Sequence, residues 1–139
     1  MDLDALETSF DLVAPKGDEL MEIFYARLFA VAPAVQPLFA GADMKRQQAM
    51  LLSALVLLRK SLRDLERVVP TLRNLGARHV AYGAEAAHYP VVGEVLIGAM
   101  ATVAGEAWEP RFTAAWVEAF GVVAGVMAEG AASVETLAA

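Results

Sequence analysis

The sequence contains no cysteine, and this absence excludes several kinds of structure and chemistry. A chain without cysteine can form no disulfide framework and no zinc knuckle, and it offers no thiolate as nucleophile or metal ligand. These exclusions fit a reducing compartment. The acidic start of the chain, MDLDALE, also lacks the basic and apolar regions of a signal peptide. We therefore expect a cytoplasmic protein.

Long apolar runs and an excess of positive charge are also missing. The uncharged run Ala49–Leu58 has about half of the roughly 20 residues that a membrane-spanning helix needs, so no membrane span is expected. The net charge of −6 argues against nucleic-acid binding. Basic residues nevertheless gather between Lys45 and Arg78, where eight Lys or Arg stand against two acidic residues. This basic region is either a solvated helical face or a surface for an anionic group.

The sequence also lacks strand-like alternation and internal repeats, whereas apolar residues recur at helical spacing along most of it. At 139 residues, 58% of them apolar, the chain has the size and composition of one globular domain, residues 1–139. We predict an all-α fold. The expected helices cover about 2–13, 18–31, 44–63, 68–82, 90–105 and 110 onward, with a tight helical turn at about 33–39. The spacing of Gly121 and Gly125 predicts a close contact with another helix.

Common catalytic motifs are absent. The sequence has no G-x-S-x-G motif, no Walker A loop and no G-x-G-x-x-G, which excludes the usual acyl-transfer and phosphate-cradling sites. The stretch from Glu85 to His88 matches the Glu-x-x-His of carboxylate-bridged di-iron bundles, but such a site needs the motif twice and two further glutamates. With two histidines in the chain, a histidine-rich zinc site is equally unsupported.

Three polar side chains nevertheless lie on apolar helical faces. His79 shares one face with Leu72 and Leu75, where an imidazole either makes a structural hydrogen bond, the commoner case, or binds a metal. Tyr25 looks inward, as a core residue bonded to a backbone carbonyl or as a hydroxyl directed into a ligand cavity. Gln47 lies one turn before an apolar stripe and either faces solvent or donates to a ligand. The residues alone leave these alternatives open.

A haem site needs one strong nitrogen ligand, a large apolar slot and a few polar groups on the opposite side, and this chain can supply all of them. The segments FYARLFAVAPAVQPLF and LGARHVAYGAEAAHYPVVGEVL resemble the distal and proximal segments of bacterial single-domain haemoglobins, which are similar to the globin domain of flavohaemoglobins. The resemblance covers nearly the entire chain. It implies a globin fold of six to eight helices around a haem crevice.

The resemblance also implies the cofactor, haem b (iron protoporphyrin IX), and the residues that surround it. His79 would be the iron ligand. The other residues implied are Tyr25 and Gln47 on the distal side and Tyr89 beneath His79 as catalytic groups, with Phe39, Leu51, Leu55 and Tyr89 in contact with the haem. From its place beside His79, we also expect Arg78 to lie next to a propionate. His88 is expected to be a solvent-facing corner residue.

One position departs from the flavohaemoglobin pattern. The proximal glutamate that completes the family's hydrogen-bonded triad would fall at Ala131. Glu129 lies two residues earlier, about 200° around a helix, so we expect it to point elsewhere. Its absence from the triad would weaken the electron push of His79 on the iron, because the partner of a ligating histidine sets its basicity.

The resemblance implies a haem protein that binds O2, NO and CO and, when reduced by a separate reductase, converts nitric oxide to nitrate by dioxygenation. A non-catalytic oxygen carrier or gas-sensing globin is the alternative. A haem-free, globin-like interaction domain is disfavoured, because His79, Tyr25 and Gln47 would then have no reason to coincide. We expect a monomer or weak homodimer. The basic region would hold propionates and, through Arg59, Lys60 and Arg63, dock an acidic reductase.

Overall fold

The computed structural model describes residues 1–85 and 87–138 and confirms the all-α prediction, since these residues contain helices and no strand. In chain order the elements are α1 (Leu3–Val13), η1 (Ala14–Lys16), α2 (Gly17–Val31), η2 (Pro33–Phe39), α3 (Met44–Lys60), η3 (Leu65–Val68), α4 (Val69–Ala81), α5 (His88–Ala104), η4 (Gly105–Ala107) and α6 (Pro110–Ala138), where η marks a 3₁₀ helix.

Short polar residues and prolines set the beginnings of the helices. Asp2 Oδ1 accepts the Ala5 N–H at 3.0 Å and so caps α1. Asp43 caps α3 in the same way. Pro110 is the first residue of α6, where its missing N–H has no helical partner to lose. Helix α5 begins at His88, slightly earlier than predicted, because Pro90 is tolerated anywhere in the first turn.

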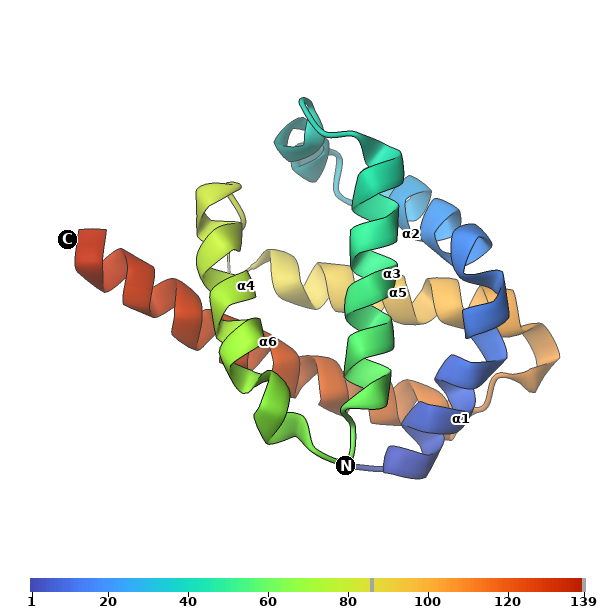
Figure 1. Cartoon of the computed structure of the whole chain (residues 1–139). Helices are drawn as coiled ribbons and strands as arrows, with labels where there is room; N and C mark the ends of the chain where they lie inside the picture. Colours follow the sequence, from blue (N-terminus) through green and yellow to red (C-terminus); the bar gives the residue numbers. More distant parts are fainter. Residues whose placement is uncertain (86, 139) are drawn as a thin grey trace.

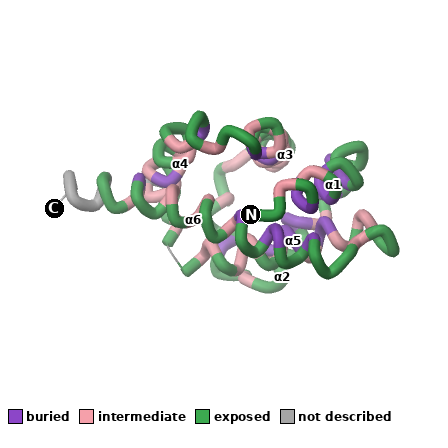
Figure 2. The backbone as a smooth tube through the Cα atoms, turned by 90° about the horizontal axis from the view of Figure 1, so that it is seen from below, coloured by how far each residue is buried: buried purple, intermediate pink, exposed green. Residues whose placement is uncertain are grey.

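The helices form two crossing layers. In Figure 1, α3 passes in front of α5, and α4 passes in front of α6. Figure 2, turned by 90°, shows α3 and α4 on one side of the molecule and α5 and α6 on the other. α1 packs against α5 and α6, and α2 packs against α5. The arrangement leaves α3 and α4 as two separate helices of one layer, joined by the short element η3.

The predicted apolar stripes form the core. The buried residues of the stripes predicted on α2, α3, α5 and α6 are Leu20, Met21, Phe24, Tyr25, Leu28, Leu55, Leu58, Leu62, Leu96, Ala99, Met100, Phe112, Trp116 and Ala119. The pattern is less complete on α3, α5 and α6. The stripe members that are only half-buried are Leu51, Val92, Val103, Phe120, Val123 and Met127. Burial is therefore densest where α1, α2, α5 and α6 meet.

Two helices, residues 88–107 and 110–133, are apolar and long enough to cross a membrane by length and composition alone. Core helices of globular proteins pass the same test. Both helices contribute to the buried core, through Met100 on α5 and Trp116 on α6. Counting uninterrupted apolar runs did not reveal them, because charged residues such as Glu94 and Glu118 interrupt their sequences.

One prediction about the glycines is wrong. Gly121 and Gly125 face open space, since a Cβ added at either would meet nothing within 4 Å. The close approach of two helices occurs instead at Gly76 on α4 and Gly130 on α6. The four-residue spacing identified glycines on one helical face, but it could not show whether that face has a neighbour.

A buried hydrogen-bond chain joins α1 to α6. The Trp116 indole N–H donates to Ser9 Oγ at 2.8 Å, and the Ser9 hydroxyl donates to the Ala5 carbonyl at 2.6 Å. Both side chains are fully buried, so the indole N–H has no access to water. The serine thereby satisfies the one polar atom of the largest side chain in the core.

We expect Ser9→Ala to destabilise the protein by about 1–3 kcal/mol, because the Trp116 N–H would remain buried without an acceptor. Chemical denaturation of both proteins measures this difference. Thr8→Ala removes a hydroxyl from an exposed position of the same helix and should change stability little. Equal stabilities of the Ser9 and Thr8 variants would contradict the assigned role of the serine.

Candidate functional site

Tyr25 lies in the middle of α2 with 7% of its surface exposed. Its hydroxyl donates to the backbone carbonyl of Gln47 at 3.5 Å, which is the outer limit of a hydrogen bond. Burial raises the pKa of the Tyr25 hydroxyl to about 12, because the phenolate would lose its hydration. The group is therefore a neutral donor at physiological pH, and only a weak bond restrains its direction.

Aromatic rings surround Tyr25. Phe24 and Phe39 meet it edge to face, with ring centroids 4.9 and 5.8 Å away, and Phe29 lies at 6.1 Å. Phe29 and Phe39 also contact each other, at 5.4 Å. Phe39 was predicted to belong to the site, whereas Phe29 was not. Its position four residues after Tyr25, on the same helical face, is the signal that could have identified it.

Gln47 lies in the first turns of α3, next to the Asp43 cap, and is half-buried. The structure brings it beside Tyr25, and the observed contact uses the backbone carbonyl of Gln47. Leu51, one turn further along, is half-buried, and Leu55 is buried in the core. Tyr25 and Leu55 belong to the buried core, Phe39 and Leu51 pack against that core, and Gln47 joins them through its contact with Tyr25.

His79 lies near the end of α4 and is half-buried. Its Nδ1 atom is 2.6 Å from the carbonyl oxygen of Leu75. Because a carbonyl oxygen can only accept, Nδ1 carries a proton, and Nε2 is the ring nitrogen that this bond leaves available to a metal. The ring of Tyr82, a residue that the sequence analysis missed, packs edge to face on the imidazole with centroids 5.8 Å apart. Its spacing of three residues from His79 is the available signal.

The remaining predicted residues lie around this end of α4. Arg78 is exposed and precedes His79. Tyr89 is half-buried in the first turn of α5, and burial raises the pKa of its hydroxyl. His88 is also half-buried, and its Nδ1 accepts the Glu85 backbone N–H at 3.0 Å, so it closes the corner between α4 and α5.

Glu129 does not reach His79. Its carboxylate forms an ion pair with Arg73 at 3.0 Å, on the outer side of the contact between α4 and α6. The partner of His79 Nδ1 is the backbone carbonyl of Leu75. A neutral carbonyl polarises an imidazole less than a carboxylate does, so this site holds the ring without the electron push of a carboxylate. The expectation that Glu129 points elsewhere agrees with this geometry.

The apolar sides of α3 and α4 are less covered than the rest of the core. In Figure 2, α4 is mostly pink and green, whereas α5 carries purple segments. Leu51 on α3 and Leu75 on α4 are only half-buried. A large apolar metal cofactor requires apolar contact area and one nitrogen ligand. The half-buried leucines can supply the contact area, and Nε2 of His79 can supply the ligand. The residues present therefore fit haem.

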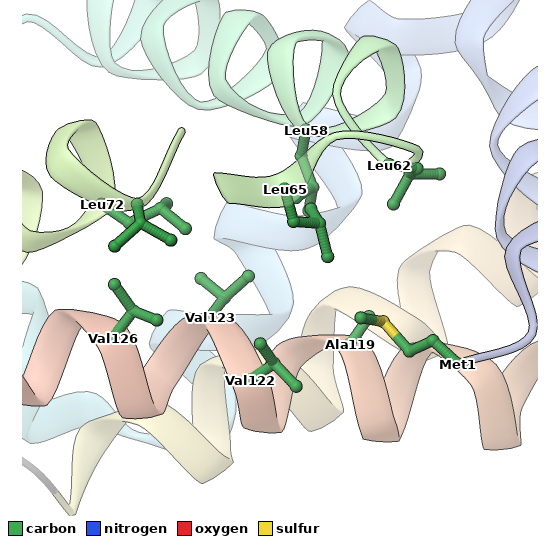
Figure 3. A pocket seen from close by; sticks show the side chains of 10 residues that line it. Met1, Leu58, Leu62, Leu65, Leu72, Ala119, Val122, Val123 and Val126 are labelled. Atoms are coloured by element: carbon green, nitrogen blue, oxygen red, sulfur yellow. The ribbon is translucent and has the colours of Figure 1, made fainter. Parts of the chain in front are cut away.

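An apolar pocket lies elsewhere, between α3, η3 and α4 on one side and α6 on the other (Figure 3). Figure 3 shows Leu58, Leu65 and Leu72 facing Val123 and Val126 across it. None of the predicted site residues lines this pocket. A pocket without polar groups offers nothing to orient a ligand, so its chemistry differs from that of the site around Tyr25 and His79.

Two residues of the basic region pair with acidic residues of α1. Arg59 pairs with Asp11 and Glu7 at 3.0 and 3.2 Å, and Arg63 pairs with Glu7 and Asp4 at 2.7 and 3.0 Å. Three carboxylates of α1 thus balance two of the three positive charges predicted to dock an acidic reductase. The sequence could not show this neutralisation, because the acids lie about 50 residues before the arginines.

We expect the ion pairs between α1 and α3 to lose their stabilising effect in acid. Hydrogen bonding to Arg63 lowers the pKa of Glu7, and hydrogen bonding to Arg59 lowers that of Asp11. A lowered carboxyl pKa stabilises the folded state above the unfolded pKa, about 4.3 for glutamate, and the effect disappears as the pH falls through the folded pKa. The unfolding temperature should therefore fall more steeply below about pH 4.3 in the wild type than in Arg63→Gln.

The control for this experiment is Arg67→Gln, which removes the same charge from an exposed pair with Asp64 at 3.9 Å. Its unfolding temperature should follow the wild-type pH dependence. If the unfolding temperatures of the wild type and Arg63→Gln changed equally with pH, the pairs with α1 would contribute no pH-dependent stability.

Comparison with known proteins relates these residues to a family. The sequence pattern of the globin family matches residues 22–127, a range that contains every predicted site residue. A flavohemoprotein from Bacillus thuringiensis subsp. konkukian is 33% identical over 124 residues, which cover 88% of this chain and 30% of that protein. A flavohemoprotein from Deinococcus radiodurans is 34% identical over 113 residues, covering 80% of this chain and 28% of its own length. The chain thus spans less than a third of these relatives.

Solved structures agree with the predicted fold. A bacterial globin from Campylobacter jejuni superimposes with a TM-score of 0.81 over 96% of each chain, at 22% identity. An engineered carbene transferase from Rhodothermus marinus gives a TM-score of 0.81 over 96% of this chain and 95% of its own, at 24% identity. At these identities the likeness establishes the fold alone. The globin fold expected from the sequence is confirmed.

Proposed function

Because this chain belongs to the globin family, we propose that it binds haem b between α3 and α4, with Nε2 of His79 as the axial ligand of the iron. The single observation that carries this proposal is the 2.6 Å hydrogen bond from His79 Nδ1 to the Leu75 carbonyl. It fixes both the tautomer and the orientation that a histidine ligand needs. The half-buried apolar sides of the two helices supply the contact area.

The other residues of the proposed site exclude water and hold the charged edge of the cofactor. Phe39 and Leu51 would contact the macrocycle, and buried Leu55 closes the site toward the core. Arg78, exposed beside His79, would pair with a propionate. Reduced haem, when bound, supplies the reversible binding of O2, NO and CO.

Tyr25 and Gln47 are the proposed hydrogen-bond donors to the bound gas. The Tyr25 hydroxyl stays protonated, and its present bond to the Gln47 carbonyl is long enough to be exchanged for a stronger one. The rings of Phe29 and Phe39 limit the directions that the phenol can take. Gln47, half-buried in the first turns of α3, adds an amide donor from the neighbouring helix.

The activity that we propose is oxygen binding with dioxygenation of nitric oxide to nitrate, in which a separate reductase supplies the electrons. The flavohemoprotein relatives support this proposal. A second candidate is a non-catalytic oxygen carrier or gas sensor. One observation favours it: Glu129 pairs with Arg73 and therefore gives His79 no carboxylate partner. Consumption of nitric oxide by the reduced, oxygenated protein with a reductase present separates the two.

His79→Ala should abolish tight haemin binding, because the other histidine of the chain, His88, lies at the corner after α4, where its Nδ1 accepts the Glu85 N–H. The test titrates haemin into both proteins and follows the absorption of the bound form. His88→Ala, which removes the other histidine of the chain from the corner after α4, is the matched control and should keep haemin binding. Added imidazole should restore a ligated spectrum to the His79 variant. Haemin binding that survives in His79→Ala without imidazole would refute the ligand assignment.

Tyr25→Phe should speed oxygen dissociation by about 10- to 100-fold, the effect of losing a hydrogen bond to a charged acceptor worth about 1.5–3 kcal/mol. Stopped-flow replacement of O2 by CO measures this rate. Tyr82→Phe removes the hydroxyl of a tyrosine that is 60% exposed and should leave the rate unchanged. Equal oxygen dissociation rates in the wild type and Tyr25→Phe would mean that the phenol does not contact the gas.

A further inference from the structure

The backbones of α4 and α6 touch where these helices cross. A Cβ added at Gly76 on α4 would overlap the carbonyl oxygen of Met127, and a Cβ added at Gly130 on α6 would overlap the carbonyl oxygen of Arg73. The contact is reciprocal, since each glycine lies against the residue three positions before the other glycine. Both glycines are buried. Only hydrogen atoms fit between the two backbones at this crossing.

The backbone contact is a property of this crossing, because other glycines of the chain make no such contact. Gly121 and Gly125 lie on the same helix α6, and a Cβ at either position would meet open space. Elsewhere in the described chain, Gly93 on α5 has ordinary van der Waals room next to Phe120. Alanine would therefore be accommodated at those positions, whereas at Gly76 and Gly130 the obstructing atoms are backbone atoms that no side-chain rotation can move.

An ion pair lies at the same crossing. Arg73, whose carbonyl faces Gly130, extends its guanidinium to Glu129, the residue before Gly130, with Nε and Oε2 3.0 Å apart. The glycines thus set how closely α4 approaches α6, and the ion pair joins the same two helices at the edge of the contact. α6 is the principal neighbour of α4 in the part of the chain that the structure describes.

His79 lies one turn beyond this contact. It follows Gly76 by three residues, which places it about 4.5 Å further along α4 and about 60° around it. Leu75, whose carbonyl accepts the imidazole Nδ1–H, is the residue directly before Gly76. A shift of the α4 backbone at Gly76 must therefore move both the imidazole and its hydrogen-bond acceptor.

We propose that Gly76 and Gly130 are positioning residues for His79: their backbone contact sets the distance of α4 from α6, and with it the position from which the imidazole ligates iron. This inference rests on the proposed function, in which His79 is the haem ligand. A methyl group at either glycine forces the two helices apart, and His79 then moves away from α6 with its helix. The length or tilt of the iron–histidine bond changes as a result.

The test compares four single substitutions of the same kind. Gly76→Ala and Gly130→Ala should shift or broaden the iron–histidine stretching band of the ferrous protein in resonance Raman spectra. Both should also release haemin to a scavenging apoprotein at least about tenfold faster. Gly121→Ala and Gly125→Ala should leave the band and the release rate unchanged. These two controls should also raise the unfolding temperature, because alanine stabilises a helix interior relative to glycine.

The haem-free proteins provide a readout that does not depend on the cofactor. Alanine at position 76 or 130 should lower the unfolding temperature of the haem-free protein. If either variant is too unstable to purify, the same substitution is made together with Gly121→Ala and Gly125→Ala, whose added helix stability should restore folding. The proposal is overturned if folded Gly130→Ala keeps both the wild-type band and the wild-type haemin release rate.

Two further outcomes are distinguishable from this one. A wild-type protein that binds no haemin would refute the proposed function, while the unfolding temperatures would still test the contact between the helices. Loss of folding in both alanine variants, even in the stabilised background, would overturn the positioning role, since the glycines would then maintain the fold as a whole and not His79 in particular.

Discussion

The packing of α4 against α6 is the constraint on which the site depends. Gly76 and Gly130 bring the two backbones into contact, and the Arg73–Glu129 pair joins the same two helices. One side of α4 is therefore packed against α6. The side that carries Leu75 and His79 is only half-buried, so the helix presents an imidazole within an apolar surface that the rest of the chain does not fully cover.

The two halves of the site hold their polar groups with different strength. The His79 imidazole is bound tightly, at 2.6 Å, to a carbonyl of its own helix. The Tyr25 hydroxyl is bound loosely, at 3.5 Å, to a carbonyl of another helix. The first arrangement suits a metal ligand that must keep one orientation. The second suits a donor that turns toward an incoming gas molecule, and the surrounding phenylalanine rings restrict that movement.

The sequence predicted the fold well wherever the deciding information is local. Apolar residues at helical spacing predicted the helix ranges to within a few residues, because this pattern depends on neighbours within a turn or two. The choice between the glycine pairs could not be made in this way. Gly121 and Gly125 have the more suggestive spacing, yet the contact is made at Gly76 and Gly130, which only the crossing of two helices brings together.

The site shows the same division between local and long-range information. Leu75 and His79 are four residues apart on one helix, so their contact follows from helical geometry. Tyr25 and Gln47 are 22 residues apart on different helices, and their proximity was anticipated through the resemblance and not through spacing. The pairing of Arg59 and Arg63 with α1 was not anticipated, because nothing in the sequence near the arginines indicates which acids the fold brings beside them.

The central claim is that this chain holds a histidine-ligated haem able to keep O2 bound. The visible absorption spectrum of the purified protein tests it most directly, recorded for the ferric form, after reduction with dithionite and after exposure of the reduced form to oxygen. We expect the spectrum of a histidine-ligated b-type haem and an oxygenated form that persists. A colourless protein that takes up no added haemin would contradict it.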